Sequence, residues 1–171
     1  MELLIPGLIL VALMVYASTR IKKSAAQAFE PETIDTDLFY FEKPEGFLTV
    51  LNGKPELEYE GYSREFGGDG AEDIRQGRVE VRMIENSSFK DMVAKIGESA
   101  KITSKTTEVI DQRKYLLVEA ERVEKGAGMV ELYKLSESGR DVIELKITAL
   151  EETNEDVARK ITGIATSYYV K

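Results

Sequence analysis

The chain has 171 residues and contains no histidine, no cysteine and no tryptophan, and it carries 23 basic against 31 acidic side chains, a formal net charge of −8. Without histidine or cysteine, the chain cannot form a Ser-His-Asp triad, a cysteine nucleophile, a disulfide or a zinc site of the usual nitrogen and sulfur type. Only carboxylate, hydroxyl, lysine and tyrosine chemistry remains. Since no spacing of these groups demands a catalytic site, we expect a protein that is not an enzyme and has no cofactor.

The first strong pattern is an uncharged N-terminal run, LLIPGLILVALMVYA, at residues 3–17. About 17 helical residues span roughly 25 Å, which is at the short end for crossing a bilayer. Pro6 suits the first turn of a helix, where its missing N–H costs least. The run predicts a transmembrane anchor formed by Leu3, Leu4, Ile5, Leu8, Ile9, Leu10, Val11, Leu13, Met14, Val15 and Tyr16.

A secretory signal peptide and a buried core or partner helix are the alternatives for this segment. A signal peptide usually has positive charge before its apolar run, and here Glu2 is the only charged side chain before it. A core helix would have one polar face. Arg20, Lys22 and Lys23 follow the run. We therefore expect a single-pass protein of a cell membrane or an organelle inner membrane. The positive-inside rule places its N-terminus outside and the following domain on the cytoplasmic side.

The sequence after the anchor divides into a short connection and one domain. We expect residues 1–29 to form the anchor and a juxtamembrane helix, residues 30–37 (EPETIDTD) to form a linker, and residues 38–171 to form a soluble α+β domain. Residues 29–171 hold 20 basic and 30 acidic groups. A domain this acidic is a poor partner for nucleic acid, because phosphate neutralisation needs a basic surface.

Most of the domain follows a period of two, the pattern of half-buried antiparallel strands. Val79, Val81 and Met83 alternate with charged residues, for example, and Ile143, Leu145 and Ile147 share one face of their segment. The predicted strands are 38–41, 47–51, 56–65, 78–85, 101–110, 114–124, 129–135 and 141–149. Gly139 suits a positive-φ position in the turn before the last of these strands.

Two segments have the period of an amphipathic helix instead. In 88–98, Ser88 and Asp91 approximate a capping box before the apolar side chains. In 154–168, Thr153 is the expected N-cap. The order β-β-β-β-α-β-β-β-β-α predicts an α+β domain, an antiparallel sheet with two packed helices.

This order and the segment Tyr40–Phe47 (YFEKPEGF) resemble the family of the photosystem II extrinsic subunit P, the PsbP-like domains. The segment is similar to that family's opening strand and Pro-x-Gly-aromatic turn, and the two helices and the meander at 101–149 occupy similar relative positions. The resemblance implies an α/β/α sandwich over residues 37–171 and a non-enzymatic accessory or assembly role at a membrane complex. The classical members are lumenal and extrinsic, whereas this chain has an expected membrane helix of its own and an expected cytoplasmic domain.

Three groups of side chains are candidates for a site. Gly67–Asp73 (GGDGAED) offers Asp69, Glu72 and Asp73 as candidate ligands for Ca²⁺ or Mg²⁺, but the spacing is not that of an EF-hand, and we expect a solvated loop and no metal site. The strand glutamates are expected to form a solvated face; they are Glu58, Glu60, Glu80, Glu131 and Glu144. Tyr62, Phe66, Tyr168 and Tyr169 lie near segment ends and are the candidates for contact with a partner.

These observations favour a non-catalytic, membrane-anchored accessory or assembly subunit of a larger membrane protein complex, respiratory or photosynthetic in type. Its expected partners are an integral membrane protein complex and the lipid bilayer, through the N-terminal helix. A membrane-tethered ligand-binding or sensor module is the alternative, and a carboxylate-based enzyme is the third.

Overall fold

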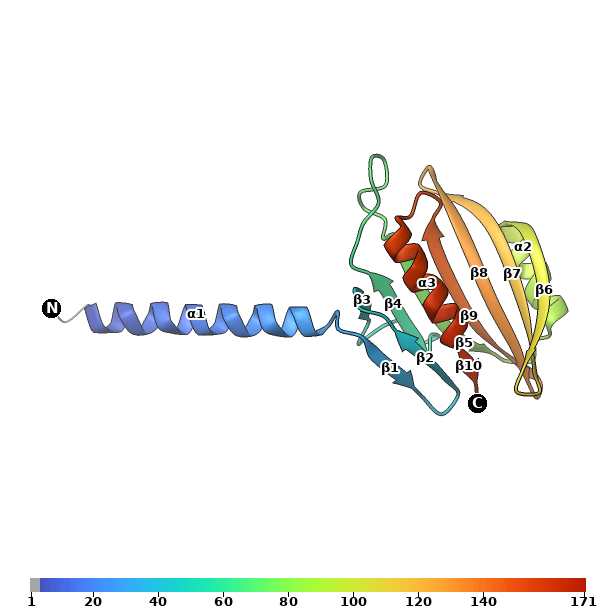
Figure 1. The fold of residues 1–171 in the computed structure, drawn as a ribbon, viewed down its shortest axis with the longest axis horizontal. Coiled ribbons are helices and arrows are strands. Elements are labelled where there is room, and N and C mark those ends of the chain that lie inside the picture. The colour runs from blue at the N-terminus through green and yellow to red at the C-terminus, as the bar shows by residue number, and fades with distance from the viewer. Residues whose placement is uncertain (1–3) are drawn as a thin grey trace.

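The N-terminal helix stands apart from the rest of the chain in the computed structural model, which describes residues 4–171. Helix α1 (Leu4–Gln27) projects away from a domain that contains every other helix and strand (Figure 1). The side chains of Val11, Leu13, Met14, Val15 and Tyr16 are all exposed, each by 59% or more. Among the described residues, no helix is both long enough and apolar enough to cross a bilayer.

The described residues cover only part of the predicted anchor. Leu3 lies outside them, and so do the side chains of Leu4, Ile5, Leu8, Ile9 and Leu10. Of the three basic residues that predict the orientation, Arg20 and Lys22 are exposed on α1, whereas the side chain of Lys23 is also outside the described part. The helix continues beyond the apolar run to Gln27, two residues before the end of the predicted juxtamembrane helix.

The domain is built on a seven-stranded antiparallel sheet with the strand order β3-β4-β5-β9-β8-β7-β6. Its strands are β3 (Phe47–Thr49), β4 (Tyr59–Ser63), β5 (Gly77–Ile84), β6 (Lys101–Ile110), β7 (Arg113–Glu124), β8 (Ala127–Ser138) and β9 (Asp141–Leu150). A second sheet of three strands has the order β1-β2-β10, formed by β1 (Glu32–Asp35), β2 (Phe39–Lys43) and β10 (Tyr169–Val170).

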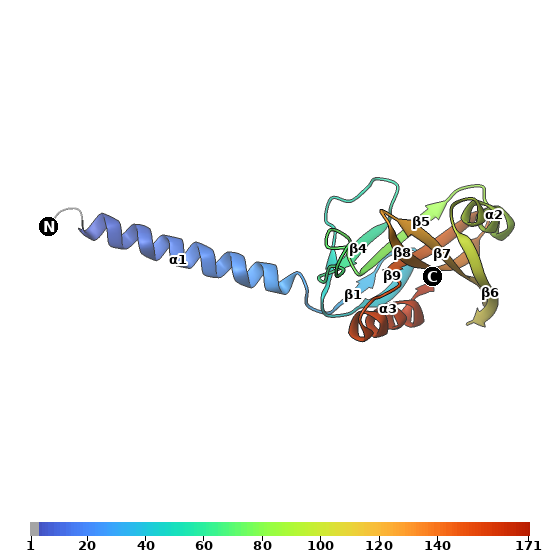
Figure 2. The same cartoon turned by 90° about the horizontal axis from the view of Figure 1, so that it is seen from above.

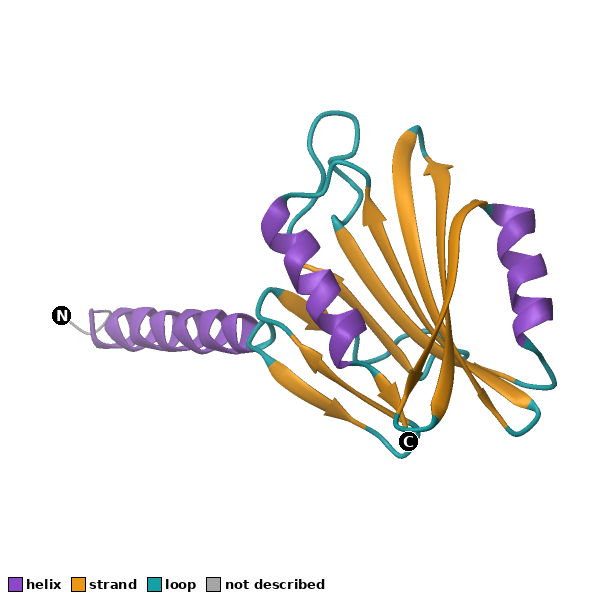
Figure 3. Cartoon of the chain, turned by 45° about the vertical axis from the view of Figure 1, so that its right-hand side comes forward, coloured by secondary structure: helices purple, strands orange, loops and turns teal. Residues whose placement is uncertain are grey.

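Helices α2 (Phe89–Ser99) and α3 (Glu155–Ser167) cover opposite faces of the large sheet (Figure 2). The main core lies on the α3 side, where Val79, Leu145 and Ile147 of the large sheet meet Phe41 of the small sheet and Val157 of the helix. A smaller core beneath α2 includes Met92, Ile96, Val118 and Leu135. Figure 3 shows α3 next to the small sheet and α2 at the far side of the large one.

Both domain helices begin at side-chain caps. The capping box predicted at Ser88 is confirmed, since Asp91 N–H donates to the Ser88 side chain and the Asp91 carboxylate accepts from Ser88 N–H. The cap predicted at Thr153 is wrong: Asn154 accepts from Val157 N–H, and Thr153 instead donates to the carbonyl of Gln76. The turn glycine Gly139 has the expected positive φ, at 67°.

The predicted linker at residues 30–37 is wrong for the middle half of its length. Residues 32–35 form β1, which pairs antiparallel with β2, so Ile34 lies opposite Phe41 and is buried in the main core. The globular part therefore begins earlier than residue 38. The eight predicted strands and two predicted helices all occur in the predicted order, and β1 and β10 are added at the two ends. The α+β class is confirmed.

Candidate functional site

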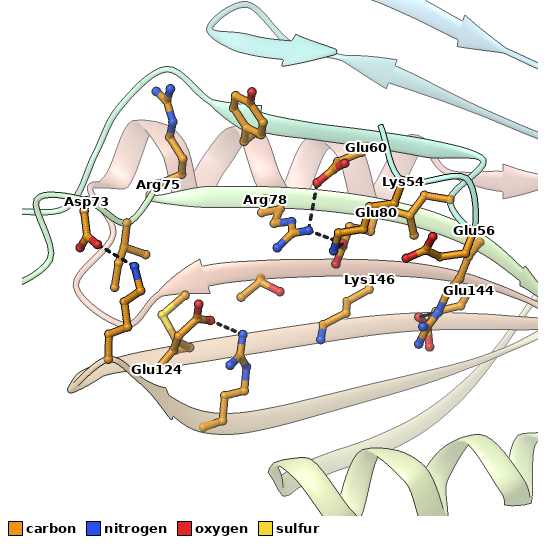
Figure 4. Close-up of a pocket in the computed structure, with 18 residues that line it drawn as sticks. Lys54, Glu56, Glu60, Asp73, Arg75, Arg78, Glu80, Glu124, Glu144 and Lys146 are labelled. Atoms are coloured by element: carbon orange, nitrogen blue, oxygen red, sulfur yellow. Dashed lines mark hydrogen bonds and ion pairs between the residues drawn. The ribbon is translucent and has the colours of Figure 1, made fainter. Parts of the chain in front are cut away.

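The face of the large sheet beside α2 carries charged side chains where the opposite face carries core residues. Because side chains alternate along a strand, Val79 and Val81 face α3, whereas Arg78, Glu80 and Arg82 face the α2 side. The register places these three residues opposite Thr148, Lys146 and Glu144 of β9. Directly opposed residues share a face of the sheet, so the two strands build one charged surface (Figure 4).

This surface is the floor of a hollow of about 580 Å³. Four of the nine arginines of the chain line it, and in all it is lined by seven basic and six acidic side chains in an otherwise acidic domain. The basic residues are Lys54, Arg75, Arg78, Arg82, Arg122, Lys125 and Lys146, and the acidic ones are Glu56, Glu60, Asp73, Glu80, Glu124 and Glu144. Figure 4 shows Glu144 and Glu56 at one end of the hollow and Asp73 at the other.

Glu131 of β8 is fully buried beneath this surface and has three partners. Its Oε1 accepts from Arg122 Nε at 2.6 Å and lies 2.8 Å from Lys146 Nζ, and its Oε2 accepts from the Tyr133 hydroxyl at 2.6 Å. Burial opposes the charge, but the hydrogen bonds from Lys146, Tyr133 and Arg122 outweigh it and lower the pKa of Glu131. Glu131 is therefore ionised at neutral pH and holds two of the basic side chains in place.

Glu144 of β9 is as deeply buried as Glu131, at 1% exposed, but its carboxylate is less completely hydrogen-bonded. Its Oε1 accepts from Arg82 Nε at 2.7 Å, and its Oε2 is buried with no hydrogen-bond partner among the described residues. Burial raises the pKa of Glu144, and the nearby charges of Arg82 and Lys146 only partly offset this effect. This face of the sheet thus contains one buried carboxylate that is fully paired, Glu131, and one that is only half paired, Glu144, which lines the hollow.

The prediction of a solvated glutamate face is therefore wrong for Glu131 and Glu144, and it is confirmed for Glu58, which is exposed. Glu60 and Glu80 are half-buried and both pair with Arg78, at 2.9 and 2.6 Å. The local alternation is correct, but a charged face is solvated only if nothing covers it. The sequence signal that was missed is the run of arginine and lysine at matching alternate positions, since cross-strand partners neutralise these carboxylates.

Arg75 joins two of the four partner candidates at the rim of the hollow. Its guanidinium carbon lies 3.7 Å from the centre of the Phe66 ring and 5.0 Å from that of Tyr62. Arg75 Nη1 donates to the carbonyl of Arg64 at 2.7 Å, which fixes the side chain. Phe66 is 45% exposed, so the cluster presents an aromatic surface to solvent. The sequence identified the two aromatic residues but not the arginine between them.

The other two partner candidates lie elsewhere. Tyr168 is 1% exposed and packs against Phe39 and Phe41, so its prediction as a partner contact is wrong: the C-terminus of α3 turns this side chain into the core. Tyr169 is 41% exposed and stacks on Tyr40, with the ring centres 4.9 Å apart, on the small sheet. It remains a surface residue away from the hollow.

The glycine-rich loop does not gather its carboxylates. Within the described residues, no group of three or more acidic side chains is arranged to hold a metal ion, so Asp69, Glu72 and Asp73 do not converge. Asp73 instead forms a hydrogen-bonded ion pair with Lys125, at 2.6 Å, which joins the loop to the turn between β7 and β8. This pair closes one end of the hollow (Figure 4).

Comparison with known proteins places the fold. No family model matches the sequence, and no curated protein matches it. Solved structures that match include cyanobacterial PsbP (CyanoP) from Synechocystis sp. PCC 6803, with a TM-score of 0.55 and 14% identity over 83% of this chain and 92% of that one. The domain has a PsbP-like fold.

Two further PsbP-like neighbours are similar over comparable lengths. LpqN of Mycobacterium tuberculosis, described as involved in cell envelope biogenesis, has a TM-score of 0.61 and 7% identity over 83% of this chain and 91% of that one. The Ran-binding protein Mog1p of Saccharomyces cerevisiae has a TM-score of 0.52 and 12% identity over 83% and 96%. At these identities the likeness shows the fold alone. The resemblance read from residues 40–47 is confirmed at that level, with α2, the large sheet and α3 as the three layers.

Proposed function

We propose that this protein is a non-catalytic binding protein, an accessory or assembly subunit of a larger membrane protein complex. The observation that carries the proposal is the cluster of Arg75, Tyr62 and Phe66 at the rim of the charged hollow. Arginine and tyrosine are enriched among the residues that dominate protein interfaces. Because Arg75 is already fixed by a backbone carbonyl and two rings, a partner would lose little binding free energy in ordering this side chain.

The charge of the hollow supports a protein partner over nucleic acid or lipid. The domain is acidic, so neither phosphate backbones nor anionic headgroups attract it as a whole. The hollow presents both signs of charge next to an aromatic cluster, a mixture that a complementary protein surface can match residue by residue. One protein with this fold, Mog1p, is described as Ran-binding, and this agrees with a binding role.

We further propose that α1 holds the protein at the membrane complex. The uncharged run at residues 3–17 and the exposure of Leu13, Met14 and Val15 support this role, because exposed apolar side chains are favourably covered by lipid or another protein. Arg20 and Lys22, both exposed, follow the run and favour a domain on the cytoplasmic side. Protease added to intact cells should then leave the domain uncut.

The test is extraction of the tagged full-length chain in mild detergent, followed by a native gel and mass spectrometry of what migrates with it. We expect migration with a large complex. Phe66→Ala and Arg75→Ala should each release the chain from that complex, because they remove the centre of the proposed contact. Val109→Ala and Arg140→Ala are matched controls, since they change an exposed apolar and an exposed basic residue outside the hollow. A small monodisperse species in the wild-type extract would refute the proposal.

A further inference from the structure

The floor of the hollow contains a buried hydrogen-bond acceptor with no donor among the described residues. Glu144 is 1% exposed and lines the hollow, and while its Oε1 pairs with Arg82, its Oε2 has no partner in the part of the chain that the structure describes. Buried polar atoms are nearly always hydrogen-bonded, because an unpaired one retains its full desolvation penalty. A donor brought by a ligand would remove that penalty.

The side chains around Glu144 restrict the charge of such a ligand. A simple anion would meet the carboxylates of Glu56, Glu80 and Glu144, and a simple cation would meet Arg78 and Arg82. A molecule that carries both charges avoids either repulsion. Arg82 supports this choice, because its side chain is 42% exposed while its Nε is already bound to Glu144. Its guanidinium group therefore has room for a second carboxylate.

We propose that the hollow binds a small zwitterion, an amino acid or a short peptide, with the ammonium group on Glu144 Oε2 and the carboxylate on Arg82. Glu144 and Arg82 are directly opposed on β9 and β5. The ammonium and carboxylate groups of one small ligand can therefore contact these two neighbouring side chains. The volume of about 580 Å³ lies within the range of about 300–1,000 Å³ that is usual for ligand pockets. This inference does not depend on the proposed role in a membrane complex.

The neighbouring buried network leaves this position open. Lys146, on the same face of β9 as Glu144, is bound to Glu131 at 2.8 Å and lies over the Tyr133 ring. Glu131 in turn also holds Arg122. These pairs fix the basic side chains around the floor, so that Lys146 does not supply the donor that Glu144 Oε2 lacks. An ammonium group that reaches Oε2 requires this buried atom to become accessible, but it would displace no existing hydrogen bond of Glu144.

The test is isothermal titration calorimetry of the full-length chain with each of the standard amino acids and with glycylglycine. We expect at least one of them to bind with a dissociation constant of about 1 mM or tighter. Two analogues of the bound compound test the two charges separately: the N-acetylated form lacks the ammonium group and the decarboxylated amine lacks the carboxylate. Both should bind at least about tenfold more weakly, since each loses one charge-assisted hydrogen bond.

Variants assign the two ends of the ligand. Glu144→Gln and Arg82→Gln should each weaken binding by about tenfold or more, whereas Glu119→Gln, which changes an exposed glutamate of β7 outside the hollow, should leave it unchanged. The proposal is overturned if no compound of the panel gives heat of binding, or if the N-acetylated analogue or Glu144→Gln retains wild-type affinity. If a variant fails to fold, the two analogues still decide the question on the wild-type chain.

Discussion

Lys43 Nζ donates to the backbone carbonyl of Glu30 at 2.6 Å and so ties the end of the N-terminal helix segment to β2. The lysine is 2% exposed, donates also to the carbonyl of Phe47 at 3.0 Å, and lies 3.8 Å from the Glu32 carboxylate. Burial lowers the pKa of Lys43, and the charge of Glu32 opposes this shift. The hydrogen bonds of the buried Lys43 thus hold in place a segment that the sequence predicts to be a linker.

Replacement of this lysine should loosen the joint between α1 and the domain. Lys43→Met keeps the length of the side chain but leaves the carbonyls of Glu30 and Phe47 without this donor, and we expect a loss of about 1–3 kcal/mol in the free energy of unfolding. Urea denaturation measures the loss, and a glutamyl-specific protease should cleave the Glu32–Thr33 bond faster in the variant. Lys105→Met, at an exposed position of β6, is the control. Equal stability of the two variants would show that Lys43 does not hold the joint.

Two buried tyrosines should respond to the same substitution in opposite directions. The Tyr115 hydroxyl accepts from Val170 N–H at 2.9 Å, so Tyr115→Phe leaves a buried donor unpaired and should cost about 1–3 kcal/mol. The Tyr168 hydroxyl is buried with no partner among the described residues. Tyr168→Phe should therefore be neutral or stabilise the protein by up to about 1 kcal/mol, because it removes an unsatisfied polar group. Thermal and urea denaturation of both variants compares them, and a loss of stability in Tyr168→Phe would contradict the structure.

The stabilising contribution of Glu131 should disappear in acid. Its pKa is lowered in the folded state, so its contribution is present above the unfolded value of about 4.3 and is lost as the pH falls through the folded value. Glu131→Gln should cost about 2 kcal/mol at neutral pH, and the difference from the wild type should shrink at pH values below the unfolded pKa. Urea denaturation across this pH range measures the effect. A constant difference at every pH would refute the assignment of a lowered pKa.

The pH dependence of Glu144 should have the opposite sign. Its pKa is raised in the folded state, so its contribution is present below the unfolded value and is lost as the pH rises through the folded value. The free energy of unfolding of Glu144→Gln, relative to that of the wild type, should therefore be higher at pH 7 than at pH 4. Glu119→Gln, at an exposed position, should show no comparable trend. If Glu144→Gln follows the same trend with pH as Glu131→Gln, the two carboxylates do not differ as described.

Charge placed in the apolar run should release the protein from membranes, if α1 is the tether that we propose. Leu13→Lys together with Met14→Lys puts two cations in the segment, at a cost of about 2.5–3.5 kcal/mol each near the centre of a bilayer. We expect this variant in the supernatant after alkaline extraction and the wild type in the pellet. Val109→Lys together with Val123→Lys adds the same charge at exposed domain positions and should stay in the pellet. Wild-type chain in the supernatant would refute the tether.

Much of the fold could be predicted from local pattern. Each alternating segment, such as the one around Val79 and Val81, became a strand, and Ser88 and Asp91 marked the start of α2. The short strands β1 and β10 were missed, since their few residues carry little periodicity and they are strands only because both pair with β2. Tyr168 was misplaced for a related reason: the backbone after α3, which no local pattern describes, turns it towards Phe39 and Phe41.

The sequence by itself excluded catalytic and zinc sites that need histidine or cysteine, and the acidic charge of the domain argued against a nucleic-acid partner. The alternation of side chains also determined which residues share a face of a strand. Only the tertiary structure decided which charged side chains of a strand face are buried and which residues they pair with. Glu144 meets Arg82 from 62 residues away along the chain, and Lys43 reaches back to the end of the N-terminal helix segment. Burial and pairing of a charge depend on neighbours that are distant in sequence, and so a charged pattern that reads as a solvated surface became the floor of a hollow.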